Sequence, residues 1–304
     1  MGMASLHRDL FYDQTFNTIF DAEQRIEALL RFEKELAIAQ AAMGMIPQSA
    51  ALAIENYCQS DRINIERLTL ESAQGGNVLI ALLRQCTELM QKDDSDSSNY
   101  IHFGATSQDA IDTASMIQYQ KATYWISSKL KQLIQRLVRL AEMHHHTPMI
   151  GRTFLQQAKP ITFGLKIAGW IDGLFPVYQS INALRFPIQI GGAVGSWTGL
   201  DAQTYEKMSA ALAKNLQLDQ PFKPWHSQRQ PIMQIATTLG MLNAQLSKLT
   251  NDLVLMAQTE IGEISFNVPG QGGSSSMPHK NNPVNGILVL SNGMRIPHLV
   301  SAIL

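Results

Sequence analysis

The stretch from Gln108 to Thr147 constrains the fold most, because it contains neither glycine nor proline. Both residues commonly end helices, so their absence favours one continuous helix, whose 40 residues would extend about 60 Å. Apolar residues recur in this stretch at alternating spacings of four and three, at Ile126, Leu130, Leu133, Leu137 and Leu140. This spacing is typical of a helix that packs along its length against other helices.

A second segment repeats the spacing, at Ile235, Leu239, Leu242, Leu246, Leu249, Leu253 and Met256. Further helices are predicted over about 21–43, 162–184 and 201–216, the first capped by Asp21. The acidic, polar stretch 93–99 reads as a loop between domains. We therefore predict an all-α fold, with a small N-terminal helical domain (1–98) followed by a long antiparallel helical bundle (99–304). Periodicity alone favours a purely structural bundle, and only the connections between the helices argue against it.

Composition narrows the class of protein. Apolar residues make up 45% of the chain, charged residues 16%, and the net charge is −1. A chain with so few charges and no long basic run is not expected to bind nucleic acid or a membrane surface, and its apolar surface favours oligomerisation. Two cysteines, Cys58 and Cys86, are too few for a disulfide framework or a thiolate metal site. Neither a signal peptide nor an 18-residue apolar run is seen, so a cytoplasmic location is expected.

The connections between these helices carry polar chemistry, beginning with the sequence His-Phe-Gly-Ala-Thr-Ser-Gln-Asp at 102–109. Thr106 lies where the long helix should begin, and Asp109 completes a variant of the capping box. Unpaired N–H groups at a helix N-terminus attract anions, and His102, Thr106 and Ser107 add further donors. This first motif is a candidate carboxylate site, although a simple helix cap with a loop histidine fits it as well.

The second motif is Gly-Arg-Thr-Phe-Leu-Gln-Gln-Ala-Lys-Pro at 151–160. Arg152 and Gln156 are donors suited to anions, although a basic loop between helices has the same composition. The preceding triplet His144–His146 is not expected to bind a metal, because adjacent helical residues do not share a face.

The third motif, Gly-Gly-Ser-Ser-Ser-Met-Pro-His-Lys-Asn-Asn-Pro at 272–283, is the most specific. Its glycines and serines offer backbone N–H donors, and Lys280 and Asn282 add a charge and an amide. Such a loop is able to close over an anion and stabilise developing charge.

Together, in this order and spacing, the three motifs resemble the signature regions of the fumarase/aspartase superfamily over nearly the whole chain. The resemblance implies long helices, homotetramers whose active sites combine several subunits, and chemistry through an aci-carboxylate intermediate without a redox cofactor or metal. By family position, Ser274 would be the catalytic residue. Lys280 and Asn282 would bind substrate, together with His102, Thr106 and Ser107 and, less directly, Arg152 and Gln156.

Within the superfamily, the first motif is similar to the adenylosuccinate lyase and 3-carboxy-cis,cis-muconate cycloisomerase branch. The lyases carry a catalytic histidine in the second motif, where this chain has Phe154. They also carry a His-Asp pair where this chain reads Gln74-Gly75-Gly76-Asn77. A lyase that expels an amine needs a general acid, whereas a cycloisomerase adds the substrate's own carboxylate to its own double bond. The segment 224–229, Pro-Trp-His-Ser-Gln-Arg, is also similar to the cycloisomerases.

The resemblance therefore implies a cycloisomerase that acts on a small tricarboxylate in protocatechuate catabolism, the β-ketoadipate pathway. Two alternatives stay open, an adenylosuccinate lyase-type C–N lyase and an inactive or structural homologue. Related enzymes have a further helical domain after the third motif, and we expect it to be absent from this chain.

Overall fold

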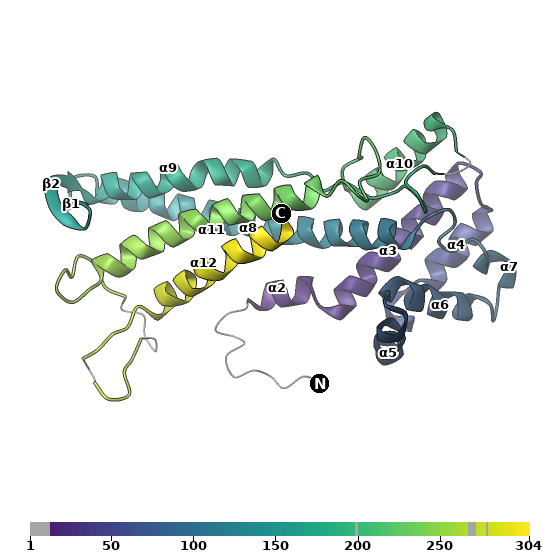
Figure 1. The fold of residues 1–304 in the computed structure, drawn as a ribbon, viewed down its shortest axis with the longest axis horizontal. Coiled ribbons are helices and arrows are strands. Elements are labelled where there is room, and N and C mark those ends of the chain that lie inside the picture. The colour runs from purple at the N-terminus through teal and green to yellow at the C-terminus, as the bar shows by residue number, and fades with distance from the viewer. Residues whose placement is uncertain (1–12, 198–199, 267–271, 278) are drawn as a thin grey trace. The chain divides into compact units, whose positions relative to one another are not determined.

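The structure is a computed structural model that describes residues 13–197, 200–266, 272–277 and 279–304 (Figure 1). Its elements, in chain order, are α2 (Gln14–Ile19), α3 (Ala22–Ala42), α4 (Gln48–Tyr57), η1 (Ser60–Arg62), α5 (Ile65–Gly75), α6 (Val78–Met90), α7 (Ser95–Ser98), α8 (Ser107–Met143), β1 (Pro148–Thr153), β2 (Gln156–Thr162), α9 (Phe163–Asn182), α10 (Ala202–Leu216), α11 (Gln230–Met256) and α12 (Val284–Ile303). The all-α prediction is confirmed, with one two-stranded sheet as the exception.

Contacts divide the chain into two compact units that alternate along the sequence. The bundle unit contains Tyr124–Leu184 and Ile232–Leu304, and the α3 unit contains Asp13–Thr123 and Arg185–Pro231. The divisions fall within α8 and after the first two residues of α11, so both helices contribute to both units. The predicted domains, 1–98 and 99–304, have other boundaries than these two units, and they remain a prediction.

The bundle unit is built on the repeating apolar positions. Leu130 and Leu137 of α8 are buried with Leu242, Leu249 and Met256 of α11. Helix α9 completes this core with Ile167, Trp170, Leu174, Val177 and Ile181. Each leucine buried in this way contributes about 1.5–3 kcal/mol, so the alternating spacing of four and three accounts for the packing.

The second motif differs from its prediction as an interhelical loop. Helix α8 ends at Met143, four residues before Thr147, and β1 and β2 form an antiparallel hairpin in its place. Phe154 and Leu155 make the turn with φ angles of 49° and 62°. Consecutive positive φ values characterise tight hairpin turns, which normally use Asn-Gly, so this Phe-Leu pair gave no turn signal in the sequence.

In the α3 unit, helix α3 supplies the centre of the core with Leu29, Leu30, Phe32 and Leu36, none more than 1% exposed. Asp21 caps this helix by accepting a hydrogen bond from the Gln24 N–H at 2.7 Å, as predicted. The stretch 93–99, predicted to be a loop, contains the short helix α7. Asp94 caps α7 through the Ser97 N–H, a local bond that turns an acidic stretch into a helical turn.

Helix α12 packs on α11, where a Cβ on Gly286 would lie 2.7 Å from the Val254 side chain. It is long and apolar enough to cross a membrane by length and composition, and 6% of it is buried. We had predicted no membrane-crossing segment, because the sequence has no uninterrupted run of 18 apolar residues. The mean hydropathy of α12 is nevertheless high, because its apolar residues outweigh its polar ones, Asn285, Asn292, Arg295 and His298. The same composition suits a helix that packs in an apolar bundle.

Candidate active site

The first motif forms the N-terminus of α8. Thr106 precedes the first helical residue, Ser107, and its N–H donates to Oδ2 of Asp109 at 3.0 Å. This confirms the acid half of the predicted capping box. Thr106 and Ser107 are both half-buried, at the helix end whose first N–H groups have no partner within the helix.

Asp109 ties three segments of the α3 unit together and is fully buried. Its Oδ2 also accepts the Gly192 N–H at 2.9 Å, and its Oδ1 lies 2.7 Å from Nε2 of His226. His226 belongs to the 224–229 segment, which is similar to the cycloisomerases. No local pattern pointed to this pair, because 117 positions separate the two residues.

His102 is held by a second buried acid, Glu33 of α3, whose Oε1 lies 2.8 Å from the imidazole Nδ1. His102 adopts a left-handed φ of 57°, which is uncommon outside glycine and turns its side chain toward α3. Burial lowers the pKa of His102, but the charge and hydrogen bond of Glu33 outweigh burial and raise the pKa above its ordinary value of 6.5. The pair therefore favours a positively charged imidazole beside the first motif.

One turn further along α8, Asp112 and Arg229 form a two-pronged ion pair at 2.6 and 2.9 Å. The Asp112 carboxylate also accepts from Gln108 and Gln189. Because two of its N–H groups are paired with Asp112, Arg229 links the 224–229 segment to α8.

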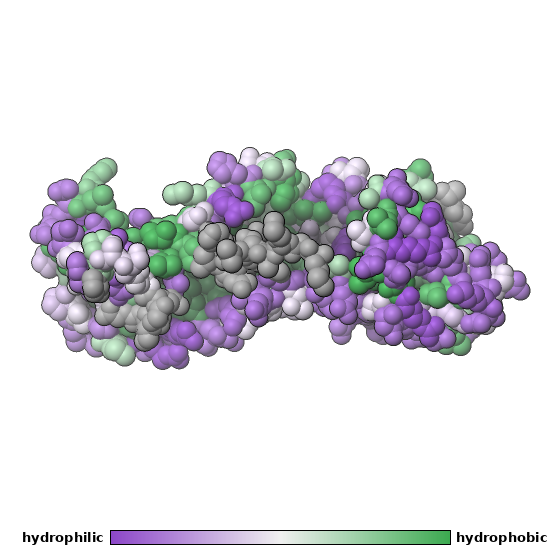
Figure 2. Space-filling view, turned by 90° about the horizontal axis from the view of Figure 1, so that it is seen from below, coloured by the Kyte–Doolittle hydropathy of each residue, from purple (hydrophilic) through white to green (hydrophobic). Residues whose placement is uncertain are grey.

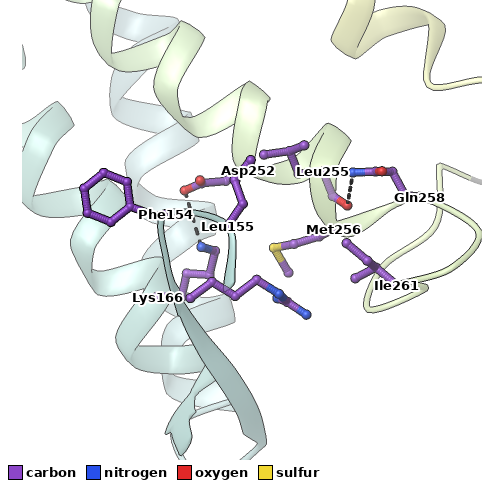
Figure 3. Close-up of a pocket in the computed structure, with 9 residues that line it drawn as sticks. Phe154, Leu155, Lys166, Asp252, Leu255, Met256, Gln258 and Ile261 are labelled. Atoms are coloured by element: carbon purple, nitrogen blue, oxygen red, sulfur yellow. Dashed lines mark hydrogen bonds and ion pairs between the residues drawn. The ribbon is translucent and has the colours of Figure 1, made fainter. Parts of the chain in front are cut away.

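In the bundle unit, Arg152 and Gln156 lie on the two strands of the hairpin. Arg152 donates two hydrogen bonds to the Glu263 carboxylate, both at 2.9 Å, so its charge is also paired within the chain. Gln156 is exposed. Beneath the hairpin is a cavity of about 530 Å³ (Figure 3), lined by Arg152, Phe154, Leu155, Lys166, Asp252, Leu255, Met256, Gln258 and Ile261.

The third motif forms a loop whose base is closed on itself. The backbone N–H and side-chain amide of Asn282 both donate to the Gly272 carbonyl, at 2.7 and 3.0 Å. Gly272 has a φ of 76°, and a Cβ there would lie 2.5 Å from the Asn282 carbonyl oxygen, so only glycine fits. Gly270, Gln271 and Pro278 lie outside the described residues.

Ser274 lies on this loop, half-buried, and its Oγ accepts the N–H groups of Ser276 and Met277 at 3.4 and 3.2 Å. Backbone donors aimed at an oxygen stabilise negative charge on it, which gives a physical route to activating a serine that the sequence did not reveal. Lys280 is exposed.

The predicted site residues thus fall into three groups, one for each motif: His102, Thr106 and Ser107; Arg152 and Gln156; Ser274, Lys280 and Asn282. Within the part of the chain that the structure describes, no three histidine, cysteine or acidic side chains are grouped to hold a metal ion. The acids that orient the histidines, Glu33 and Asp109, were not predicted as site residues.

Comparison with known proteins agrees with these motifs. A family model described as "Lyase" matches residues 7–297. The chain is 38% identical over 307 residues to 3-carboxy-cis,cis-muconate cycloisomerase from Acinetobacter baylyi, covering 99% of this chain and 68% of that protein. It is 34% identical over 282 residues to nitrosuccinate lyase from Streptomyces davaonensis, covering 90% of this chain and 60% of that protein.

Among solved structures, the crystal structure of 3-carboxy-cis,cis-muconate lactonizing enzyme from Pseudomonas putida superimposes with a TM-score of 0.91 at 37% identity. That comparison covers 98% of this chain and 67% of the crystallised one. The chain therefore spans about two thirds of the length of these cycloisomerases. The chain belongs to this lyase family, the fumarase/aspartase superfamily, and within it is similar to the 3-carboxy-cis,cis-muconate cycloisomerases.

Proposed function

We propose that this chain catalyses the closure of 3-carboxy-cis,cis-muconate to carboxymuconolactone, the reaction that names its relatives. The observation that carries the proposal is Phe154, which occupies the lyase histidine's place in the second motif. Its side chain is 100% exposed at the hairpin turn and has no group that transfers a proton. Ring closure expels no amine, so that step needs no acid there.

The reaction is an isomerisation, so every substrate atom is kept. A carboxylate oxygen of the substrate adds to its own double bond, and the electron pair of that bond moves onto the neighbouring carbon. A carboxylate beside this carbon takes up the charge as an aci-carboxylate. Ser274 then delivers one proton to the carbon, and the N–H groups of Ser276 and Met277 stabilise the serine oxygen left behind.

Binding a tricarboxylate requires several separate donors. We assign this role to His102, Thr106 and Ser107 at the start of α8, and to Lys280 and Asn282 on the loop, with Arg152 and Gln156 as supporting donors. The raised pKa of His102 supports its part, because a charged imidazole binds carboxylate more strongly than a neutral one. No cofactor takes part in this scheme.

Assembly into a homotetramer belongs to the same proposal. Large apolar side chains are exposed on the bundle unit, including Phe154 at 100%, Met294 at 74%, Leu155 at 72% and Leu165 at 61%. Figure 2 shows apolar surface, in green, on the face that it draws. Exposed apolar surface of this kind marks contact with other protein chains. We expect sedimentation at the mass of a tetramer and a cytoplasmic location; a monomer at assay concentration would contradict the assembly.

The experiment that tests the function is a pair of assays on the purified chain. We expect rapid loss of the conjugated absorbance of 3-carboxy-cis,cis-muconate and no cleavage of adenylosuccinate. Cleavage of adenylosuccinate would favour the C–N lyase alternative. Consumption of neither substrate by the assembled protein would favour the inactive homologue.

A further inference from the structure

One carboxylate with no role in the scheme above lies in the core of the α3 unit. Glu33 of α3 is 1% exposed, and its neighbours Phe32 and Leu36 are buried as well. Its Oε1 lies 2.8 Å from Nδ1 of His102, and its Oε2 has no hydrogen-bond partner among the described residues. Taking an ionised carboxylate out of water is costly unless an opposite charge accompanies it. Within the described chain, His102 is the basic side chain that pairs with Glu33.

Helix α3 holds the turn that carries His102 at two points. Besides the contact from Glu33, Gln40 donates from Nε2 to the Phe103 carbonyl at 2.7 Å and is itself fully buried. Glu33 and Gln40 are seven positions apart, about two helical turns, so both lie on the same face of α3. The imidazole and the backbone beside it are therefore fixed by one helix face.

The contact from Glu33 supplies a charge as well as an orientation. A carbonyl or an amide oxygen would also accept the Nδ1 hydrogen, but only a carboxylate adds a negative charge. Two acids act on His102, Glu33 from α3 and Asp109 from α8. Burial lowers the pKa of His102, and Glu33 contributes most to reversing that effect, so that the pKa lies above 6.5. A doubly protonated ring keeps a positive charge, and 16% of the side chain is exposed.

This charge lies near the start of α8, because the ring is close enough to be affected by Asp109 in the first helical turn. The unpaired N–H groups of that turn carry partial positive charge, so a charged imidazole adds to a field that is already positive. Like charges oppose one another, and an anion bound there would offset both. An anion at the first motif and a proton on His102 should therefore each bind more tightly when the other is present.

We infer that Glu33 is a positioning residue that keeps His102 charged, and that anion binding at the first motif is coupled to protonation of His102. This inference rests on the proposed function, which assigns the first motif to carboxylate binding, and it adds a proton to that binding step. Direct contact between His102 and the anion is not required, because charges interact over several ångströms in a protein.

The test is calorimetric binding of ethanedisulfonate, an unreactive dianion whose own charge does not change over the pH range in which histidine titrates. Wild type should bind it most tightly at low pH, and the affinity should fall about tenfold as the pH rises through the pKa of His102. Over that interval, binding should take up protons, which is measured by repeating the titration in buffers of different ionisation enthalpy. Because no turnover is needed, the result stays readable even if the chain fails to convert carboxymuconate.

Glu33→Gln separates charge from orientation, because its amide oxygen still accepts the Nδ1 hydrogen. The pKa of His102, followed by NMR of isotope-labelled histidine rings, should be lower in the variant than in wild type. At pH 6.5 the variant should bind the dianion about fivefold more weakly, and at high pH, where both rings are neutral, the two proteins should bind it equally. A purely structural role for Glu33 predicts no difference at any pH. An unchanged pKa in the variant would overturn the inference, as would wild-type binding that is absent, independent of pH or free of proton uptake.

The matched control is Gln40→Leu, which removes the hydrogen bond to the Phe103 carbonyl from the same face of α3 and changes no charge. It should lose stability and keep the fall in affinity with rising pH. Loss of that pH dependence in Gln40→Leu would assign the coupling to the shape of the turn and contradict the role of Glu33. The wild-type measurements need no substitution, so the inference stays testable if Glu33→Gln fails to fold.

Discussion

The start of α8 and the third-motif loop hold the two most informative motifs, and the chain secures them very differently. At the start of α8, two buried acids, Asp109 and Glu33, each hold a histidine, and Asp109 also accepts two backbone N–H groups. The loop is closed at its base by Asn282 and Gly272, while Ser274 bonds only within the loop among the described residues. The first region is organised by its own unit's core, and the second by local backbone geometry.

This difference indicates that the start of α8 and the third-motif loop have different roles, in binding and in chemistry. Buried carboxylates fix the carboxylate-binding donors before substrate arrives, which reduces the reorganisation needed on binding. A glycine- and serine-rich loop is free to close over the reacting carbon and bring its serine with it. Damage to the first region should therefore cost stability as well as activity, whereas damage to the loop should cost activity alone.

The largest effect is expected in the loop, from Ser274→Ala. Removing the proton-transferring hydroxyl should lower kcat roughly a thousandfold, while the midpoint of urea unfolding stays unchanged. The control is Ser275→Ala, its exposed neighbour, which should keep near-normal kcat. Equal activity in wild type and Ser274→Ala would remove Ser274 from the mechanism and favour an inactive homologue.

The next effect is expected at the start of α8, from Asp109→Ala. The change leaves the N–H groups of Thr106 and Gly192 without their acceptor and should lower the free energy of unfolding by about 3 kcal/mol. Asp201→Ala is the comparison, because Asp201 caps α10 at an exposed position and should cost about 1 kcal/mol. Urea denaturation measures both; equal losses would mean that Asp109 is no more than a helix cap.

A smaller change should separate loop geometry from loop chemistry. Gly272→Ala adds a Cβ that meets the Asn281 side chain and the Asn282 backbone, at a φ that disfavours alanine. We expect a fall in kcat/KM of about tenfold, with the unfolding midpoint little changed. The matched change Gly273→Ala has open space around its Cβ and should be tolerated. Similar activity in the two variants would show that the closed base is unimportant.

The smallest effect concerns pH. Because the folded-state pKa of His102 is raised above 6.5, its pairing with Glu33 stabilises the fold fully below pH 6.5. That contribution is lost as the pH rises through the raised value. Wild type should therefore lose stability over this interval relative to His102→Asn, as measured by urea unfolding at each pH. Parallel curves for the two proteins would contradict the pairing.

Local patterns in the sequence predicted the long helices correctly, while the roles of the three motifs stay predictions. The spacing of Leu130, Leu137, Leu242 and Leu249 was sufficient because helix periodicity is a short-range property. The hairpin was missed because Phe154 and Leu155 occupy turn positions that other residues normally fill. The pairs Glu33–His102 and Asp109–His226 were missed because each joins positions far apart in the chain, which no window of sequence brings together.

The central claim is most directly tested by turnover of 3-carboxy-cis,cis-muconate in D2O, with the product examined by mass spectrometry and NMR. The account predicts a lactone that is an isomer of the substrate and carries one deuterium on carbon, delivered through Ser274. A product that has lost or gained a group, or a lactone without deuterium on carbon, would contradict it.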